Sequence, residues 1–186
     1  MIITISGAPG SGKTSAAKIV AAKLGMPFYS MGGLRAKMAL ERGMTIDELN
    51  RLGETDKTTD TEVDDYQKKL GTTEDNFVIE GRLSWHFIPN SFKIFLDCDS
   101  TEAARRIYEA QQSAADRRED EPTYTSVEEA QAAIEQRVAS DVKRYAAIYG
   151  VDYRDHSHFD LIIDTTANTG PEQTAGAILA ALPLDR

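Results

Sequence analysis

The sequence is poor in cysteine and tryptophan and has no long apolar run. Its 186 residues include one cysteine, Cys98, and one tryptophan. A single cysteine excludes an internal disulfide and the paired cysteine spacing of a structural zinc site. No stretch has the roughly 20 consecutive apolar residues that a membrane-spanning helix needs, and the start, MIITISGAPG, lacks the basic residues and apolar length of a secretory signal. We therefore expect a cytoplasmic protein with no membrane partner.

Positive charge is also scarce. The chain has 21 Lys and Arg against 30 Asp and Glu, a formal net charge of −9. Surfaces that bind nucleic acid need clustered Lys and Arg, so this composition argues against a nucleic-acid partner. An acidic protein can still hold a small phosphorylated ligand in a local basic pocket. Nothing in the sequence specifies an assembly, and we expect a monomer or weak homo-oligomer.

Short apolar segments alternate with longer amphipathic segments along the chain. The apolar segments predict strands at 2–6, 27–29, 76–79, 92–96 and 160–163, and the segments between and after them predict helices, among them 13–24, 33–42, 60–70, 100–112, 126–149 and 171–182. Strands that are continuously apolar are covered on both faces, as in a parallel sheet. The alternation therefore predicts an α/β fold with helices on both faces of a parallel sheet, and the length fits one domain over 1–186.

A glycine-rich turn between the first strand and the first helix is the most specific motif. Residues 7–14, GAPGSGKT, match the pattern GxxxxGK[ST] at every fixed position. In this motif backbone N–H groups cradle phosphate oxygens, Lys13 adds charge at the β- and γ-phosphates, and Thr14 can bind Mg²⁺. We expect ATP to bind along Gly7, Ala8, Pro9, Gly10, Ser11, Gly12, Lys13, Thr14 and Ser15.

Arginines near the strand ends are candidates for holding a second, phosphorylated substrate. Arg82 follows the third strand, where ligands of a parallel sheet gather, and Gly81 before it permits close approach. Glu80, at the strand end, could hold a water bound to magnesium. Arg137, Asp141 and Arg144 share one helical face, which fits either a phosphate-binding group or a series of intrahelical ion pairs.

The stretch from Glu54 to Asp75 is strongly acidic. It holds eight acidic residues against three lysines. We interpret this run as a solvated outer face. The polar, charge-dense segment at 113–124 predicts a surface loop, in which Arg117 and Arg118 either close over ATP or pair with the neighbouring acids.

The ordered set of these motifs resembles the cytidylate kinases, and most closely their short, archaeal-type branch. The resemblance covers nearly the whole chain and rests on the glycine-rich loop, YSMGGLR at 29–35, EGRLS at 80–84 and IFLD at 94–97. Bacterial cytidylate kinases carry an aspartate after the Gly-Arg pair that helps to recognise the base. Leu83 stands at that position here, so the residues that recognise the base are not visible.

The resemblance implies a P-loop NTPase fold with strand order 2-3-1-4-5, a monophosphate-binding insert at about 30–72 and a lid at about 113–124. It also implies that Lys13, Arg82, Arg137 and Arg144 act on the transferring phosphates. The acceptor would be held by Ser30, Arg35, Gly81, Arg82 and Asp141, with Asp141 at the ribose. Magnesium would bind Thr14, with Glu80 acting through water.

These observations predict a kinase that uses ATP and Mg²⁺ to phosphorylate a nucleoside monophosphate, with CMP or dCMP preferred. Two alternatives stay open: a P-loop kinase for another nucleotide or small metabolite, and a nucleotide-binding switch protein without kinase turnover. The guanine-recognising motifs Asn-Lys-x-Asp and Thr-Lys-x-Asp of GTPase switches are absent from the sequence.

Overall fold

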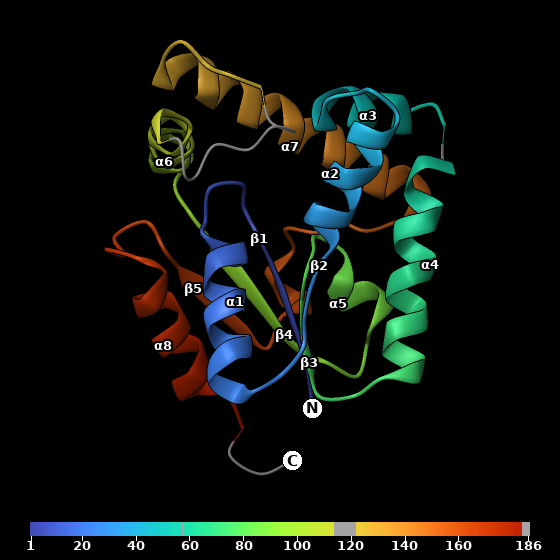
Figure 1. Cartoon of the computed structure of the whole chain (residues 1–186), viewed down its shortest axis with the longest axis vertical. Coiled ribbons are helices and arrows are strands. Elements are labelled where there is room, and N and C mark those ends of the chain that lie inside the picture. The colour runs from blue at the N-terminus through green and yellow to red at the C-terminus, as the bar shows by residue number, and fades with distance from the viewer. Residues whose placement is uncertain (57, 114–121, 184–186) are drawn as a thin grey trace.

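The fold is built on one parallel sheet. The structure, a computed structural model, describes residues 1–56, 58–113 and 122–183 (Figure 1). In these residues β1 (Ile2–Gly7), β2 (Phe28–Ser30), β3 (Phe77–Glu80), β4 (Phe92–Asp97) and β5 (Leu161–Asp164) form a sheet of order β2-β3-β1-β4-β5 with every pairing parallel. This confirms the α/β class and the expected strand order.

One face of the sheet packs against α1 (Lys13–Leu24) and α8 (Pro171–Ala181). Ile3 and Ile5 of β1 point to this side, with Val78 of β3 and Ile94 of β4, and all four are fully buried. Alternate residues along a strand point to opposite faces, so the neighbours of these residues cover the other side. Continuous apolar strands are thus explained by helices on both faces.

The opposite face packs against helices that lie between α1 and α8 in the chain. Phe77 and Ile79 of β3 contact α2 (Met31–Glu41), α3 (Ile46–Gly53) and α4 (Thr58–Thr73). Phe95 of β4 packs with Trp85 of α5 (Ser84–Phe87) and Tyr145 of α7 (Val127–Tyr149). The short helix α5 follows β3 directly and was not predicted, because four residues are too few for a helical pattern to show.

Helices also extend beyond the carboxyl ends of the strands. In Figure 1, α2, α3, α6 (Ser100–Gln112) and α7 lie above the strand ends, and α6 packs along α7. The 3-10 turn η1 (His156–His158) precedes β5. The range 30–72 contains α2, α3 and nearly all of α4, whereas most of the range 113–124, with Arg117 and Arg118, lies outside the described residues. That these segments close as an insert and a lid stays a prediction.

Helix boundaries follow capping side chains. Thr45 and Glu48 form a complete capping box before α3. At α7 the Ser126 hydroxyl accepts from the Glu129 N–H, but the Glu129 carboxylate accepts from Thr125 instead of the Ser126 N–H. Only half of a capping box is therefore formed at this helix. None of the helices in the described part of the chain combines the length and apolar character needed to cross a bilayer.

The close contact between the glycine-rich loop and α6 yields a stability prediction. A Cβ atom at Gly10 would lie 2.7 Å from the Ala103 carbonyl oxygen, and Gly10 has φ +70°. Gly25, at the end of α1, has a similar φ of +63°, but a Cβ there would meet nothing within 4 Å. Both Gly10→Ala and Gly25→Ala carry the cost of a left-handed residue, roughly 1–2 kcal/mol.

We expect Gly10→Ala to lower the free energy of unfolding by roughly 1–3 kcal/mol more than Gly25→Ala, because its methyl group must also displace backbone. Urea unfolding of the two variants measures this difference. Equal losses would show that the loop moves away from α6 at little cost.

Candidate active site

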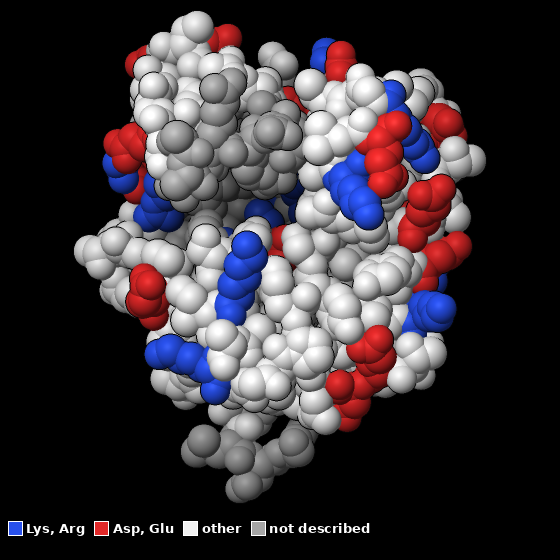
Figure 2. Space-filling view, in the orientation of Figure 1, with Lys and Arg blue, Asp and Glu red and all other residues white. Residues whose placement is uncertain are grey.

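A cavity of about 990 Å³ opens at the carboxyl ends of β1, β2 and β3. It is bordered by the glycine-rich loop, the start of α2, the inner face of α4, the turn after β3, and parts of α6 and α7. Figure 2 shows this hollow with Lys and Arg atoms inside it. Ligands of parallel α/β sheets bind at this end, so the cavity is the candidate active site.

The glycine-rich loop joins β1 to α1 at the floor of the cavity. Gly12 caps α1 in a left-handed conformation, and Gly12, Lys13, Thr14 and Ser15 all line the cavity. The first N–H groups of a helix have no acceptor within the helix, and the helix dipole makes this end positive. Ser11 donates its hydroxyl proton to the Ala8 carbonyl at 2.8 Å, which holds the loop closed on itself. The loop is therefore shaped for an anion such as a phosphate.

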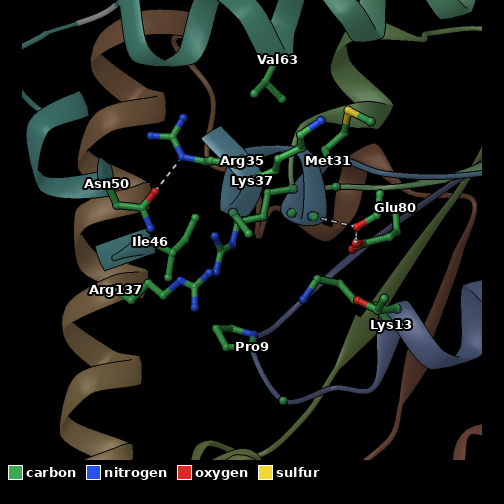
Figure 3. Close-up of a pocket in the computed structure, with 18 of the residues that line it drawn as sticks. Pro9, Lys13, Met31, Arg35, Lys37, Ile46, Asn50, Val63, Glu80 and Arg137 are labelled. Atoms are coloured by element: carbon green, nitrogen blue, oxygen red, sulfur yellow. Dashed lines mark hydrogen bonds between the residues drawn. The ribbon is translucent and has the colours of Figure 1, made fainter. Parts of the chain in front are cut away.

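Ser30 and Glu80 stand side by side because they end neighbouring strands. They are paired in the register of β2 and β3, and the Ser30 hydroxyl donates to the Glu80 carboxylate. The same hydroxyl accepts from the Gly33 N–H and so caps α2, which starts at Met31, two residues earlier than predicted. Glu80 is buried and lines the cavity near Lys13 (Figure 3).

Three arginines and two aspartates form an alternating chain of ion pairs along the cavity wall. Arg35 of α2 pairs with Asp60 of α4 at 2.7 Å, and Asp60 pairs with Arg144 of α7 at 3.3 Å. Arg144 pairs with Asp141 at 2.8 Å, and Asp141 pairs with Arg82 at 2.6 Å. The chain thus ties α2, α4, α7 and the turn after β3 together, with a lining arginine at each end.

Burial makes these ion pairs strong and mutually dependent. Asp141 is 0% exposed, Arg144 2% and Asp60 6%. Burial alone would lower the pKa of the Arg82 guanidinium, but the Asp141 carboxylate, together with Tyr153 and Tyr145, more than offsets this and holds the pKa above its ordinary value. Arg82 therefore stays a fixed positive charge at the cavity.

Hydrogen-bond donors at the cavity lack acceptors. Within the described residues, Arg82 Nε and Asn50 Nδ2 are buried without a hydrogen-bond partner, although both residues line the cavity. Asn50 meanwhile accepts from Arg35 Nε at 2.8 Å through its carbonyl oxygen (Figure 3). An unmet buried donor costs about 1–3 kcal/mol, so an anion that accepts from these groups would be favoured.

The cavity is basic although the chain is acidic. Among the described residues that line it, seven are Lys or Arg and three are Asp or Glu. The basic residues are Lys13, Lys18, Arg35, Lys37, Arg82, Arg106 and Arg137. Figure 3 shows Arg137 and Lys13 on opposite sides of the same space. The arrangement can hold two phosphorylated groups facing one another.

Most of the predicted site residues meet at this cavity. The lining includes Pro9, Gly10, Gly12, Lys13, Thr14, Ser15, Ser30, Arg35, Glu80, Gly81, Arg82 and Arg137. Gly7, Ala8 and Ser11 belong to the same loop but are not among its lining residues. A Cβ at Gly81 would lie 2.5 Å from Ser84 Oγ and 2.9 Å from Met31 Cβ, so this glycine serves packing within the protein.

Asp141 and Arg144 lie behind the cavity and pair with each other. Asp141 also pairs with Arg82, and Arg144 also pairs with Asp60 and donates to the backbone carbonyl oxygen of Asn50. Their expected contacts with the acceptor's ribose and the transferring phosphates stay predictions. The alternative of intrahelical ion pairs is realised between Asp141 and Arg144, but this pair is buried and continues to Arg82 and Asp60 on other elements.

The interpretation of the acidic run as a solvated face is wrong for part of it. Glu62 and Asp65 are exposed, but Asp60 and Asp64 are buried and line the cavity. The signal that was missed is the helical spacing of these acidic residues with apolar ones. Asp60 and Asp64 share a helical face with Val63 and Leu70, so they turn inward with the apolar residues.

Comparison with known proteins agrees with this geometry. The sequence profile of the "Cytidylate kinase-like family" matches residues 2–167. The chain is 39% identical over 166 residues to the cytidylate kinase of Methanocella arvoryzae, covering 89% of this chain and 88% of that protein. It is 32% identical over 182 residues to the cytidylate kinase of Methanobrevibacter smithii, covering 98% of both. Among solved structures, the shikimate kinase of Bacteroides thetaiotaomicron superimposes with a TM-score of 0.65 at 16% identity, covering 98% of this chain and 99% of that one.

The fold and the phosphate loop place the protein in the class of P-loop kinases. The match to the family profile over most of its length is more specific: the chain belongs to the cytidylate kinase-like family.

The buried ion pairs predict an unequal response to two Asp→Asn substitutions. Asp141→Asn leaves Arg82 and Arg144 buried with one negative charge fewer, so we expect the free energy of unfolding to fall by roughly 3–5 kcal/mol. The control is Asp152→Asn, which breaks the exposed pair with Arg154 and should cost less than about 1 kcal/mol. Urea unfolding measures both. A loss at Asp141 as small as at Asp152 would mean that solvent reaches the chain of ion pairs.

Proposed function

We propose that this protein transfers the γ-phosphate of ATP to a nucleoside monophosphate, with CMP and dCMP preferred. The observation that carries the proposal is a single basic cavity that holds the phosphate loop on one side and Arg35, Arg82 and Arg137 on the other. The related proteins of Methanocella arvoryzae and Methanobrevibacter smithii are both named cytidylate kinase, which supports CMP as the acceptor.

ATP would bind along residues 7–15, with Lys13 at the β- and γ-phosphates. Lys13 Nζ lies 3.3 Å from the Ala8 carbonyl oxygen, at the rim of the loop. Transfer breaks the bond between the γ-phosphorus and the β–γ bridging oxygen, and an oxygen of the acceptor's phosphate forms the new bond, so ADP leaves. Because that acceptor oxygen is already ionised, the reaction needs no general base.

The acceptor's phosphate would be held by Arg82 and Arg35, with Arg137 between the two substrates. Arginine suits this task because its planar guanidinium offers two parallel donors to a phosphate. The pairing with Asp141 and Asp60 holds both guanidinium groups in place before substrate arrives. Prepositioned charge stabilises the charge that develops during transfer.

The residues at the cavity also fit a magnesium ion. Thr14 offers a hydroxyl as a direct ligand, and the Glu80 carboxylate would hold a water bound to the ion; hard oxygen ligands of this kind suit Mg²⁺. The described residues contain no group of three or more His, Cys, Asp and Glu side chains placed for a metal ion. Substrate phosphates would then complete the coordination, as is usual for Mg²⁺ in kinases. When bound, the ion would neutralise charge on the β- and γ-phosphates.

An assay of ADP release tests the proposal. The acceptors are CMP, dCMP, UMP, AMP, GMP, dTMP and a set of hydroxyl metabolites, each with Mg²⁺ and ATP. We expect the highest kcat/KM with CMP or dCMP. Lys13→Ala should lose at least roughly a hundredfold in kcat, because it removes a charge from the transferring phosphates. Lys23→Ala, at the far end of α1, is the matched control and should retain activity.

Turnover with a hydroxyl metabolite and with no nucleotide would show that the acceptor is that metabolite and not a nucleoside monophosphate. Binding of ATP without turnover on any acceptor would favour a nucleotide-binding protein that is not a kinase. Undiminished activity in Lys13→Ala would contradict the role of the phosphate loop.

The position of Arg82 yields a second kinetic prediction. Arg82→Ala would leave Asp141 buried with one partner fewer and could fail to fold, so Arg82→Lys is the informative variant. Lysine keeps the charge but loses the second donor, and we expect KM for the monophosphate to rise by about tenfold or more. KM for ATP should change much less. Equal increases in both KM values would contradict the assignment of Arg82 to the monophosphate.

A further inference from the structure

The inner face of α4 carries polar groups that the transfer of phosphate does not use. Asp60, Val63, Asp64 and Gln67 are spaced at i, i+3, i+4 and i+7, and all four are buried and line the cavity. Asp60 is bound into the chain of arginines and aspartates. Asp64 and Gln67 are not part of that chain. Burying a carboxylate and an amide costs free energy, and these ion pairs do not offset that cost.

Two neighbouring side chains fix the orientation of Asp64 and Gln67. The Tyr149 hydroxyl donates to Asp64 Oδ2, and within the described residues the carboxylate accepts no other hydrogen bond. The Ser84 hydroxyl donates to Gln67 Oε1 at 2.7 Å, which leaves the amide N–H groups of Gln67 as donors. Asp64 therefore presents a hydrogen-bond acceptor to the cavity, and Gln67, one helical turn later, presents a donor.

Gln67 and Asp64 lie close to the two arginines proposed to hold the acceptor's phosphate, Arg82 and Arg35. Ser84 contacts Gly81, the residue before Arg82, so Gln67 stands next to the turn that presents Arg82. Met31 and Val63 line the same part of the cavity with apolar atoms and are labelled in Figure 3. A flat base between apolar side chains, with its polar edge toward α4, would leave its phosphate on the side of Arg35 and Arg82.

The hydrogen-bond pattern matches cytosine and opposes uracil. Cytosine presents an exocyclic amine as donor beside the acceptor N3, and uracil presents the acceptor O4 beside the donor N3–H. The Asp64 carboxylate accepts and the neighbouring Gln67 amide donates, so the two side chains complement the cytosine pattern. We propose that Asp64 accepts from the cytosine amine while Gln67 donates to N3, so that α4 selects the base. This inference rests on the proposed function and extends it.

Titration of Asp64 gives the inference a pH dependence. Burial raises the pKa of Asp64 to about 6, the Tyr149 hydrogen bond lowers it, and Asp60 raises it further. The charged and titratable side chains around Asp64 are Tyr149, Asp60, Lys68 and Arg35, with His86 against the Tyr149 ring. Above pH 6 the ionised carboxylate suits the cytosine amine, whereas below pH 6 the protonated acid can donate to O4 of uracil.

The test compares kcat/KM for CMP and UMP in the full-length protein. Asp64→Asn should lower the CMP:UMP ratio by roughly tenfold to a hundredfold, because the amide can donate to O4. Asp64→Asn combined with Gln67→Glu presents a donor beside an acceptor and should prefer UMP. Asp65→Asn, an exposed residue on the same helix, is the matched control and should keep the wild-type ratio.

The pH profile adds a readout that a purely structural role would not produce. Between pH 7.5 and 5.5 the CMP:UMP ratio of the wild type should fall, and that of Asp64→Asn should stay flat. Because the phosphate groups of CMP and UMP titrate alike, the ratio isolates the base.

Three outcomes separate the inference from the proposed function. Wild-type turnover of CMP with an unchanged ratio in Asp64→Asn and the double variant overturns the base selection and leaves the kinase standing. An equal loss on CMP and UMP in the variants also overturns it, since it shows a role in folding alone. No wild-type turnover with any nucleoside monophosphate overturns both.

Discussion

The alternating chain of Arg35, Asp60, Arg144, Asp141 and Arg82 is the constraint on which the site depends. Each aspartate sits between two arginines that come from different elements, so α2, α4, α7 and the turn after β3 share one set of ion pairs. Removal of one member leaves its buried neighbours with one counter-charge fewer, which is far more costly than the loss of a surface pair. The chain therefore couples the stability of the cavity wall to the presence of its arginines.

This chain also explains how an acidic protein can present a basic cavity. Each of the two aspartates pairs with two arginines, and three guanidinium groups against two carboxylates leave an excess of positive charge. The parallel sheet brings the phosphate loop to the same place, because β1 and β3 pair in register and end at the same edge. Sheet geometry thus sets the distance between the phosphate loop and the turn that carries Arg82, and the ion pairs hold Arg35 and Arg82 in place.

Much of the site was predictable because its signals are local. The phosphate loop is a contiguous motif between a strand and a helix, and Glu80 and Arg82 follow from their positions at a strand end, whereas Ser30 came from the family resemblance. The prediction of a fully solvated face for the acidic run was wrong because it used the charge of the run and not the helical spacing of its residues. Asp60 and Asp64 share a face with Val63 and Leu70, but only the packing of α4 shows that this face meets a cavity.

The sequence by itself determined the fold class, the strand order through its family resemblance, and the phosphate loop, because each depends on neighbours along the chain or on an ordered set of motifs. The tertiary structure alone decided which charged residues face the cavity and which stand behind it. Asp141 and Arg144 share a helix face with Arg137, yet Arg137 lines the cavity and the other two are buried in ion pairs. Spacing on one helix places residues on a face, and the elements packed against that face decide what each side chain meets.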